Sequence, residues 1–252
     1  MKIADKNKQL KIVLWLSIIF LLTTSNAFSQ NRPTPDSTDI QRQVVRTIVE
    51  RFGFRQNDGS GFAVNNHGIL TGIRGEGINV GLTSNDPVER VYQFWEHNQD
   101  LLQIQNPREE LVIPNFRRYP NGSIIVYVDQ MVSGVKVLKG GYIIDLKSDS
   151  SRTWITQITS NSHGYLPQAR NINTIPTIDS LEAGRIAMND ADNGSGKTRA
   201  SNYQLWIANF NDEPHLIWRL GTGGAVAREA SFIYMIDAHT GTILDAASAI
   251  RY

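Results

Sequence analysis

The residues most suggestive of nucleotide chemistry are Gly194-Ser195-Gly196-Lys197-Thr198, which end like a phosphate-binding loop. Such a loop needs a glycine five residues before Gly196, a buried strand before it and a helix that begins at the lysine. Only then do backbone N–H groups converge on a phosphate. Ala191 occupies the glycine position, and an amphipathic helix rather than a strand precedes it. We therefore interpret the segment as a polar loop between a helix and a strand.

Side chains able to bind a metal or act as a nucleophile are sparse. No two of the five histidines are three or four residues apart, so the chain has no helical zinc-binding pair. Glu96 and His97 are adjacent and would point in different directions on a helix. A G-x-S-x-G motif and cysteine are both absent. The adjacent carboxylates Glu109 and Glu110 are expected in a charged, solvated stretch. The spacing of Gly72, Gly75 and Gly77 differs from that of the glycine motif that binds dinucleotides. We therefore assign no catalytic residue, no metal ligand and no cofactor.

Composition indicates a globular protein and argues against nucleic acid as the main partner. The chain has 252 residues, of which 40% are hydrophobic, enough to form a core. Its net charge is only +1 at pH 7, whereas proteins that bind phosphate backbones are strongly basic. Without cysteine, no disulfide scaffold is possible.

The first residues resemble a secretory signal. Four lysines precede residues 12–22, an apolar run too short to cross a bilayer comfortably, since a span needs about 20 residues. Ala27-Phe28-Ser29 places small residues at the positions that a signal peptidase requires before Gln30. We predict that residues 1–29 are a signal peptide, that the protein is secreted or periplasmic, and that no stable membrane span remains after cleavage. An uncleaved anchor is the alternative.

Hydrophobic periodicity predicts three helices. The first begins near Ser37 or Asp39, carries Ile40, Val44, Ile48 and Phe52 on one face, widened by Val45 and Val49, and stops at Gly53. The second covers residues 87–102, with Asp86 as its cap and Glu89 reaching back to that cap. The third begins at Asp179, and its apolar stripe contains Leu181, Gly184, Ala187, Met188 and Ala191.

Strand signals follow the second and third helices. Residues 119–160 are rich in β-branched and aromatic residues, as are residues 203–208, 215–220 and 231–237. Residues 57–81 are glycine-rich and are expected to form loops with short strands, and residues 166–176 are expected to form a linker. A helix followed by antiparallel strands thus occurs twice, which predicts an α+β fold of two helix-on-antiparallel-sheet, cystatin-like subdomains.

A well-formed turn is expected near the C-terminus. Asp237 follows an apolar strand and can accept hydrogen bonds from backbone N–H groups two residues on, while Gly241 can adopt a positive φ where the chain reverses. Ile243 and Leu244 then resume a strand. By itself this pattern indicates a hairpin and no function.

Several segments together resemble the pro-regions of secreted zinc metallopeptidases. Gln130, Gly134-Val135-Lys136-Val137 and Gly140-Gly141 resemble the fungalysin/thermolysin propeptide (FTP) domain, and residues 86–111 resemble its opening helix. The helix, hairpin and closing strand of residues 177–244, which end in Asp-Ala-His-Thr-Gly, resemble a PepSY-type module. The resemblance covers roughly residues 86–250.

The resemblance implies four segments and a non-catalytic function. The segments are a signal peptide (1–29), a leader, helix and glycine-rich region (30–85), an FTP-like subdomain (86–165) and a PepSY-like subdomain (166–252). In the family, this region assists folding of the peptidase and blocks its cleft; the zinc-binding helix of the enzyme has no counterpart here. We expect a module that inhibits or chaperones a thermolysin- or fungalysin-like peptidase, in cis in a longer precursor or in trans. The alternatives are a truncated or orphaned precursor, a generic extracytoplasmic binding module, or an enzyme with unrecognised residues.

The expected contact with the peptidase lies at the C-terminal edge, because the family chain passes from there towards the enzyme. The candidate contact residues are Asp237, His239, Gly241, Ile250, Arg251 and Tyr252. The tail could enter a peptidase cleft as a substrate-like strand, with Ile250 and Tyr252 in its pockets.

Overall fold

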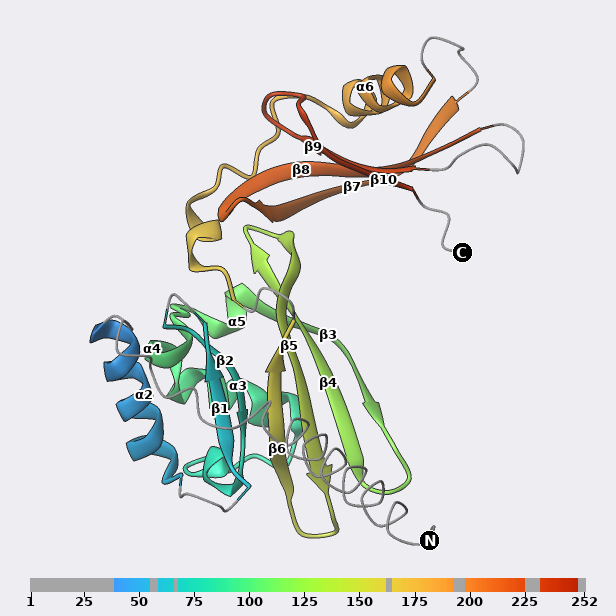
Figure 1. Cartoon of the computed structure of the whole chain (residues 1–252). Coiled ribbons are helices and arrows are strands. Elements are labelled where there is room, and N and C mark those ends of the chain that lie inside the picture. Colours follow the sequence, from blue (N-terminus) through green and yellow to red (C-terminus); the bar gives the residue numbers. More distant parts are fainter. Residues whose placement is uncertain are drawn as a thin grey trace, which may run out of the picture.

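The protein is an α+β molecule of two lobes (Figure 1). The computed structural model describes residues 39–54, 59–65, 68–161, 165–192, 198–224 and 232–248. The N-terminal lobe (39–161) contains α2 (Asp39–Phe52), β1 (Gly61–Val64), β2 (Leu70–Arg74), η2 (Glu76–Asn79), α3 (Pro87–His97), α4 (Gln99–Leu102), α5 (Pro107–Glu110), β3 (Leu111–Arg118), β4 (Ser123–Val132), β5 (Val135–Ser148) and β6 (Thr153–Ser160). The C-terminal lobe (165–248) contains η3 (Pro167–Asn171), α6 (Ser180–Asp192), β7 (Thr198–Phe210), β8 (Glu213–Gly224), β9 (Phe232–Asp237) and β10 (Ile243–Ser248).

Each lobe places helices against an antiparallel sheet, which confirms the predicted fold class. In the N-terminal lobe the strand order is β1-β2-β6-β5-β4-β3, and α2 and α3 contribute to the core on one face of this sheet. In the C-terminal lobe the order is β7-β8-β9-β10, with α6 packed against β7, β8 and β9. The predicted signal segment, residues 1–29, lies outside the described residues.

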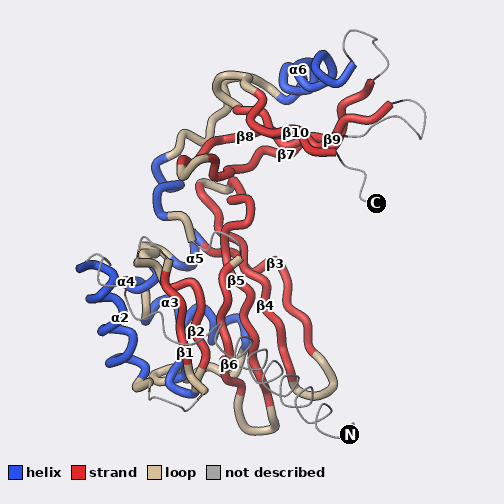
Figure 2. Tube along the Cα trace, in the orientation of Figure 1, coloured by secondary structure: helices blue, strands red, loops and turns tan. Residues whose placement is uncertain are grey.

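Strand β5 joins the two lobes into one ten-stranded sheet. Its first residues pair in parallel with β7, Lys136 opposite Trp206 and Val137 opposite Ile207, while the rest of β5 lies between β4 and β6. Figure 2 shows the strands continuing from one lobe to the other through this point. A hydrophobic cluster around the pair combines Val132 and Val137 of the N-terminal lobe with residues of the C-terminal lobe. Burial of these side chains holds the lobes together.

Helix α2 buries the face that its periodicity predicts. Ile48 and Phe52 are buried and Val44 packs against the same cluster, whereas Val49 is exposed. Gly53 ends the helix with a positive φ of 63°, and its N–H donates to the Val49 carbonyl. The same core contains residues from β2, η2, α3 and the central strands. The glycine-rich region, residues 57–81, therefore shares one core with the segment after residue 85.

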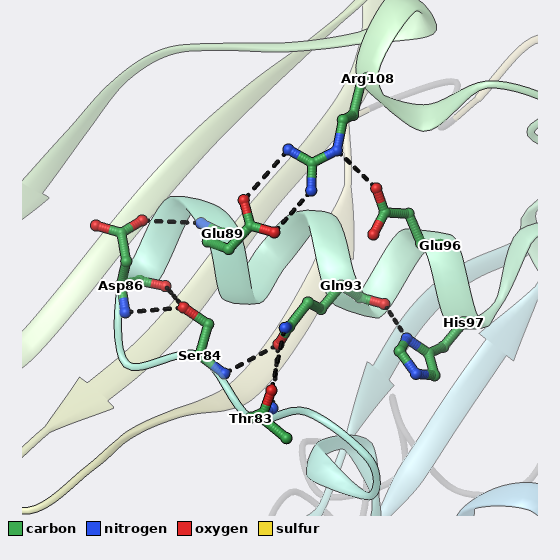
Figure 3. A network of polar contacts seen from close by, with 8 residues as sticks. All are labelled: Thr83, Ser84, Asp86, Glu89, Gln93, Glu96, His97 and Arg108. Carbon is green, nitrogen blue, oxygen red and sulfur yellow. Dashed lines mark hydrogen bonds and ion pairs between the residues drawn. The ribbon is translucent and has the colours of Figure 1, made fainter.

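Helix α3 has the predicted cap but a different partner for Glu89 (Figure 3). The Asp86 carboxylate accepts from the Glu89 N–H at 2.9 Å, whereas the Asp86 N–H donates to the Ser84 hydroxyl at 3.1 Å. Glu89 instead binds Arg108, which also pairs with Glu96 at 2.7 Å. A charge-assisted, two-point contact with a guanidinium is stronger than a return to the cap, so the predicted capping box does not form.

The predicted second helix is divided at Asn98. The buried Asn98 side chain donates to the Phe94 carbonyl at 2.7 Å, and α4 begins at the next residue. Strand β3 was not predicted, because Pro114 and a run of exposed polar residues hide its pattern. Among the described residues it is an edge strand paired with β4 alone, and a proline is tolerated at such an edge because it interrupts no ladder bond.

Helix α6 lies close to its sheet through small residues. Ala183 and Ala187 are fully buried, and Gly184 faces Tyr203 of β7. Leu181, predicted in this stripe, is instead exposed. Leu181 lies in the first turn of the helix, which begins at Ser180, and the helix packs against its sheet from Ala183 onward.

The predicted linker, residues 166–176, is packed and hydrogen-bonded rather than free. The fully buried Gln130 side chain donates to the Leu166 carbonyl and accepts from the Leu166 N–H, both at 2.9 Å. Two glycines of β5 allow the close packing of the chain around Gln130. A Cβ on Gly140 would lie 3.0 Å from the Gln130 amide oxygen, and one on Gly141 would lie 2.1 Å from the Val128 carbonyl oxygen. The Gln…Gly-Gly pattern is therefore one structural unit at the junction of the lobes.

We predict that Gly141→Ala strongly destabilises the protein. Gly141 has a φ of +116° as well as the close contact, so alanine would be strained in both respects. Gly134→Ala is the matched control, because Gly134 also has a positive φ (80°) but no atom within 4 Å of the position that the alanine methyl would take. In urea unfolding, the control should cost about 1 kcal/mol, and Gly141→Ala about 2 kcal/mol more. Equal losses would contradict the steric argument.

Candidate functional site

The candidate site is built around the turn between β9 and β10. One carboxylate oxygen of Asp237 accepts from the N–H groups of His239 at 2.9 Å and Thr240 at 2.8 Å, and from the Thr240 hydroxyl at 3.1 Å. The Gly241 N–H donates to the Asp237 carbonyl, and Gly241 adopts a φ of 76°. The predicted Asp turn and the positive φ at the glycine are both confirmed.

The second carboxylate oxygen of Asp237 holds His215 of the adjacent strand β8. The His215 Nδ1 donates to it at 2.9 Å. Burial by itself would raise the pKa of Asp237, but the hydrogen bonds from His215 and from the Thr240 and His239 N–H groups outweigh burial and lower that pKa. The carboxylate therefore stays ionised and ties the turn to the sheet.

The turn also fixes the segment that enters α6, residues 172–178, which we name the strap. The N–H groups of Thr177 and Ile178 donate to the Ala238 carbonyl at 2.9 and 3.0 Å. His239 contacts the strap with both ring nitrogens: Nε2 donates to the Asn173 carbonyl at 3.0 Å, and Nδ1 lies 3.1 Å from the Thr177 hydroxyl. Because a carbonyl can only accept, the first contact sets the tautomer of a neutral ring.

The two ends of the strap are anchored in different hydrophobic clusters. Ile172 packs against the cluster at the junction of the lobes, and Ile178 packs against the cluster beneath α6. The Trp218 indole N–H donates to the Ile178 carbonyl at 2.9 Å. The strap is thus held from both ends and along its length, and Figure 1 shows it on the outside of the molecule between η3 and α6.

A second polar cluster lies where the chain leaves the N-terminal lobe. Glu110 is largely buried and accepts from Arg170 Nε at 2.7 Å, from the Tyr165 hydroxyl, and from the N–H groups of Gln105 and Asn106. The expectation that Glu110 is solvated is therefore wrong, because its negative charge is needed to neutralise Arg170 at the junction. Beside it lies a cavity of about 490 Å³ between α5, the β4–β5 turn and η3.

The described residues offer no metal centre. Within residues 39–54, 59–65, 68–161, 165–192, 198–224 and 232–248, no three His, Asp or Glu side chains cluster as metal ligands would. His97 contacts the Gln93 carbonyl, and His215 and His239 are engaged as described above. His67, His163 and residues 193–197 of the phosphate-loop-like motif lie outside the described residues. In the part of the chain that is described, every helix lacks the length and apolar character that a membrane crossing requires.

The structure brings together three of the six predicted contact residues. Asp237, His239 and Gly241 form one rigid turn, whereas Ile250, Arg251 and Tyr252 lie outside the described residues. Sequence analysis missed His215, Asn173 and Thr177. These residues are 22 to 66 positions from their partners, and no local pattern indicates such pairs.

Comparison with known proteins identifies no family. No family model matches the chain, and none of the curated proteins matches it. Among solved structures, the C-terminal domain of YpeB from Bacillus megaterium is similar at 12% sequence identity, with 85% of this chain and 98% of that chain covered and a TM-score of 0.36. A TM-score this low supports no conclusion about this chain, so function has to be argued from the chain's own residues.

We predict that Asp237→Asn lowers stability in a pH-dependent manner. The lowered pKa of Asp237 means that its ionised form stabilises the fold above the unfolded-state pKa of about 3.9, and that this contribution is lost as the pH falls through the lower folded-state pKa. Asparagine keeps the acceptor oxygen and removes the charge. Urea unfolding should show a clear difference between wild type and variant at pH 7 that shrinks below about pH 4. A difference that stays constant down to about pH 2.5 would show that the charge is irrelevant.

Proposed function

We propose that the protein is an exported, non-catalytic propeptide-like module that inhibits, or assists the folding of, a thermolysin- or fungalysin-like zinc metallopeptidase. The observation that carries the proposal is the convergence of the residues on which the resemblance to such pro-regions rests. Gln130, Gly140 and Gly141 meet at the junction of the lobes. The Asp237–Gly241 turn fixes the strap at the outer surface of the C-terminal lobe.

The chemistry of the turn favours binding over catalysis. Both oxygens of the Asp237 carboxylate accept hydrogen bonds from within the protein, and both ring nitrogens of His239 contact the strap. A general acid or base has to exchange a proton with a substrate, and these groups are committed to holding the backbone. Their arrangement supports a rigid surface for a protein partner.

We predict that the chain from Gln30 to Tyr252 hydrolyses neither casein nor peptide substrates, with or without added zinc, because no zinc ligands or nucleophile have been identified in it. The same protein should inhibit thermolysin or a purified fungalysin, and should raise the yield of active enzyme when either is refolded from urea. Bovine serum albumin at equal mass is the control for nonspecific protection. Chelator-sensitive hydrolysis by the protein itself would contradict the proposal, as would the absence of both effects on both enzymes.

A further inference from the structure

Ile175, at the middle of the strap, is the most exposed large hydrophobic side chain among the described residues, at 76%. Exposure alternates along the strap, so that Ile172 and Ile178 pack inward on either side while Ile175 points to solvent. Leu181, at the start of α6, is exposed to a similar degree (74%). A single exposed isoleucine is ordinary on a protein surface. Ile175 is unusual because it lies on a segment whose two ends are fixed to the rest of the protein.

Hydrogen bonds fix the backbone on both sides of Ile175. The Ile175 N–H donates to the Asn173 side-chain oxygen at 3.1 Å, and His239 and Ala238 hold the residues that flank it. Pro176 restricts Ile175 to the extended region of φ/ψ space, because the proline ring excludes the helical conformation of the residue before it. The conformation is therefore set before any partner binds, which lowers the entropy cost of binding.

The chain bends at Ile175, and several backbone groups of this apex are open to a partner. Among the described residues, the N–H and carbonyl of Thr174 and the carbonyl of Ile175 make no hydrogen bond. Peptidase clefts bind chains in extended form through such groups, in the manner of strand addition, and select them by side-chain pockets. The strap offers both elements: open backbone groups and one apolar side chain.

Charge also favours an apolar cleft. Residues 171–178 read Asn-Ile-Asn-Thr-Ile-Pro-Thr-Ile and contain no ionisable side chain. The nearest ionisable residues in the sequence are Arg170, which is paired with Glu110, and Asp179, whose carboxylate accepts from the Glu182 N–H at 2.8 Å. Insertion of the apex around Ile175 would therefore bury no charge of the strap itself, and burial of an unpaired charge is costly.

We propose that the strap occupies the substrate cleft of the metallopeptidase, with Ile175 in an apolar side-chain pocket. This inference rests on the proposed function and gives the inhibitory role to the strap rather than to the C-terminal tail. Because the ends of the strap are fixed, the segment binds as a substrate does but cannot follow the movements that complete cleavage.

The experiment compares five proteins as competitive inhibitors of thermolysin and of a fungalysin: wild type, Ile175→Asp, Ile175→Leu, Val80→Asp and a deletion of residues 249–252. Val80 is the matched control, because it is 73% exposed and lies in the N-terminal lobe. The substitutions replace exposed side chains, so the thermal unfolding curves should agree with wild type. Ile175→Asp should weaken inhibition at least tenfold, since it would bury a charge in the pocket, whereas Val80→Asp and the deletion should leave it unchanged. Ile175→Leu should retain inhibition.

The outcomes separate this inference from the proposed function. If wild type inhibits an enzyme and Ile175→Asp inhibits it equally well, the strap is not the contact and the proposed function stands. If the deletion of residues 249–252 alone weakens inhibition, the tail occupies the cleft and the inference is overturned. If wild type inhibits neither peptidase but raises the yield of refolded enzyme, the inference is overturned and the proposed function stands. If wild type neither inhibits either peptidase nor raises its refolding yield, both proposals fail.

Discussion

The paired hydrogen bonds between the Gln130 side chain and the Leu166 backbone are the contact on which the arrangement of the two lobes depends. They are fully buried, so loss of either partner would leave a polar group without water or protein contacts. They fix Leu166, the residue before η3, and hence the place where η3 and the strap begin. Gly140 is needed because a Cβ there would press on Val137 and on the Gln130 amide, and Gly141 because a Cβ there would meet the Val128 carbonyl.

From that point, one carboxylate organises the outer surface of the C-terminal lobe. The Asp237 carboxylate accepts hydrogen bonds from its own turn and from His215. The turn then places the Ala238 carbonyl and the His239 ring against the strap. The strap gains order from contacts with residues more than 60 positions away in the chain. A segment without regular secondary structure is thereby as well defined as a strand, which is the property that a binding loop requires.

Local sequence patterns predicted most helices and strands of this fold, but they could not predict contacts between residues far apart in the sequence. Ile48 and Phe52 were predicted to be buried from spacing alone, and the Asp237–Gly241 turn from its residue types, because both depend on neighbours in sequence. Leu181 has the spacing of the buried stripe but is exposed, because it lies in the first turn of α6, before the residues that pack against the sheet. Glu89 pairs with Arg108 and Glu110 with Arg170. Local sequence could not predict these ion pairs, because only folding brings the partners together. The strap was interpreted as a linker because its anchors, His239 and Ala238, come much later in the sequence.

The cluster at the junction has a consequence for the order in which the chain acquires structure. The N-terminal lobe draws its main core from residues 48–165, whereas the cluster at the base of the C-terminal lobe includes Val132 and Val137 from the β4–β5 hairpin. The second lobe therefore completes its base only on a surface that the first lobe has already formed. Since synthesis proceeds from the N-terminus, that surface is available before β7 emerges. We therefore expect the hairpin to serve as the surface on which the second lobe folds, so that the lobes form one after the other rather than as independent units.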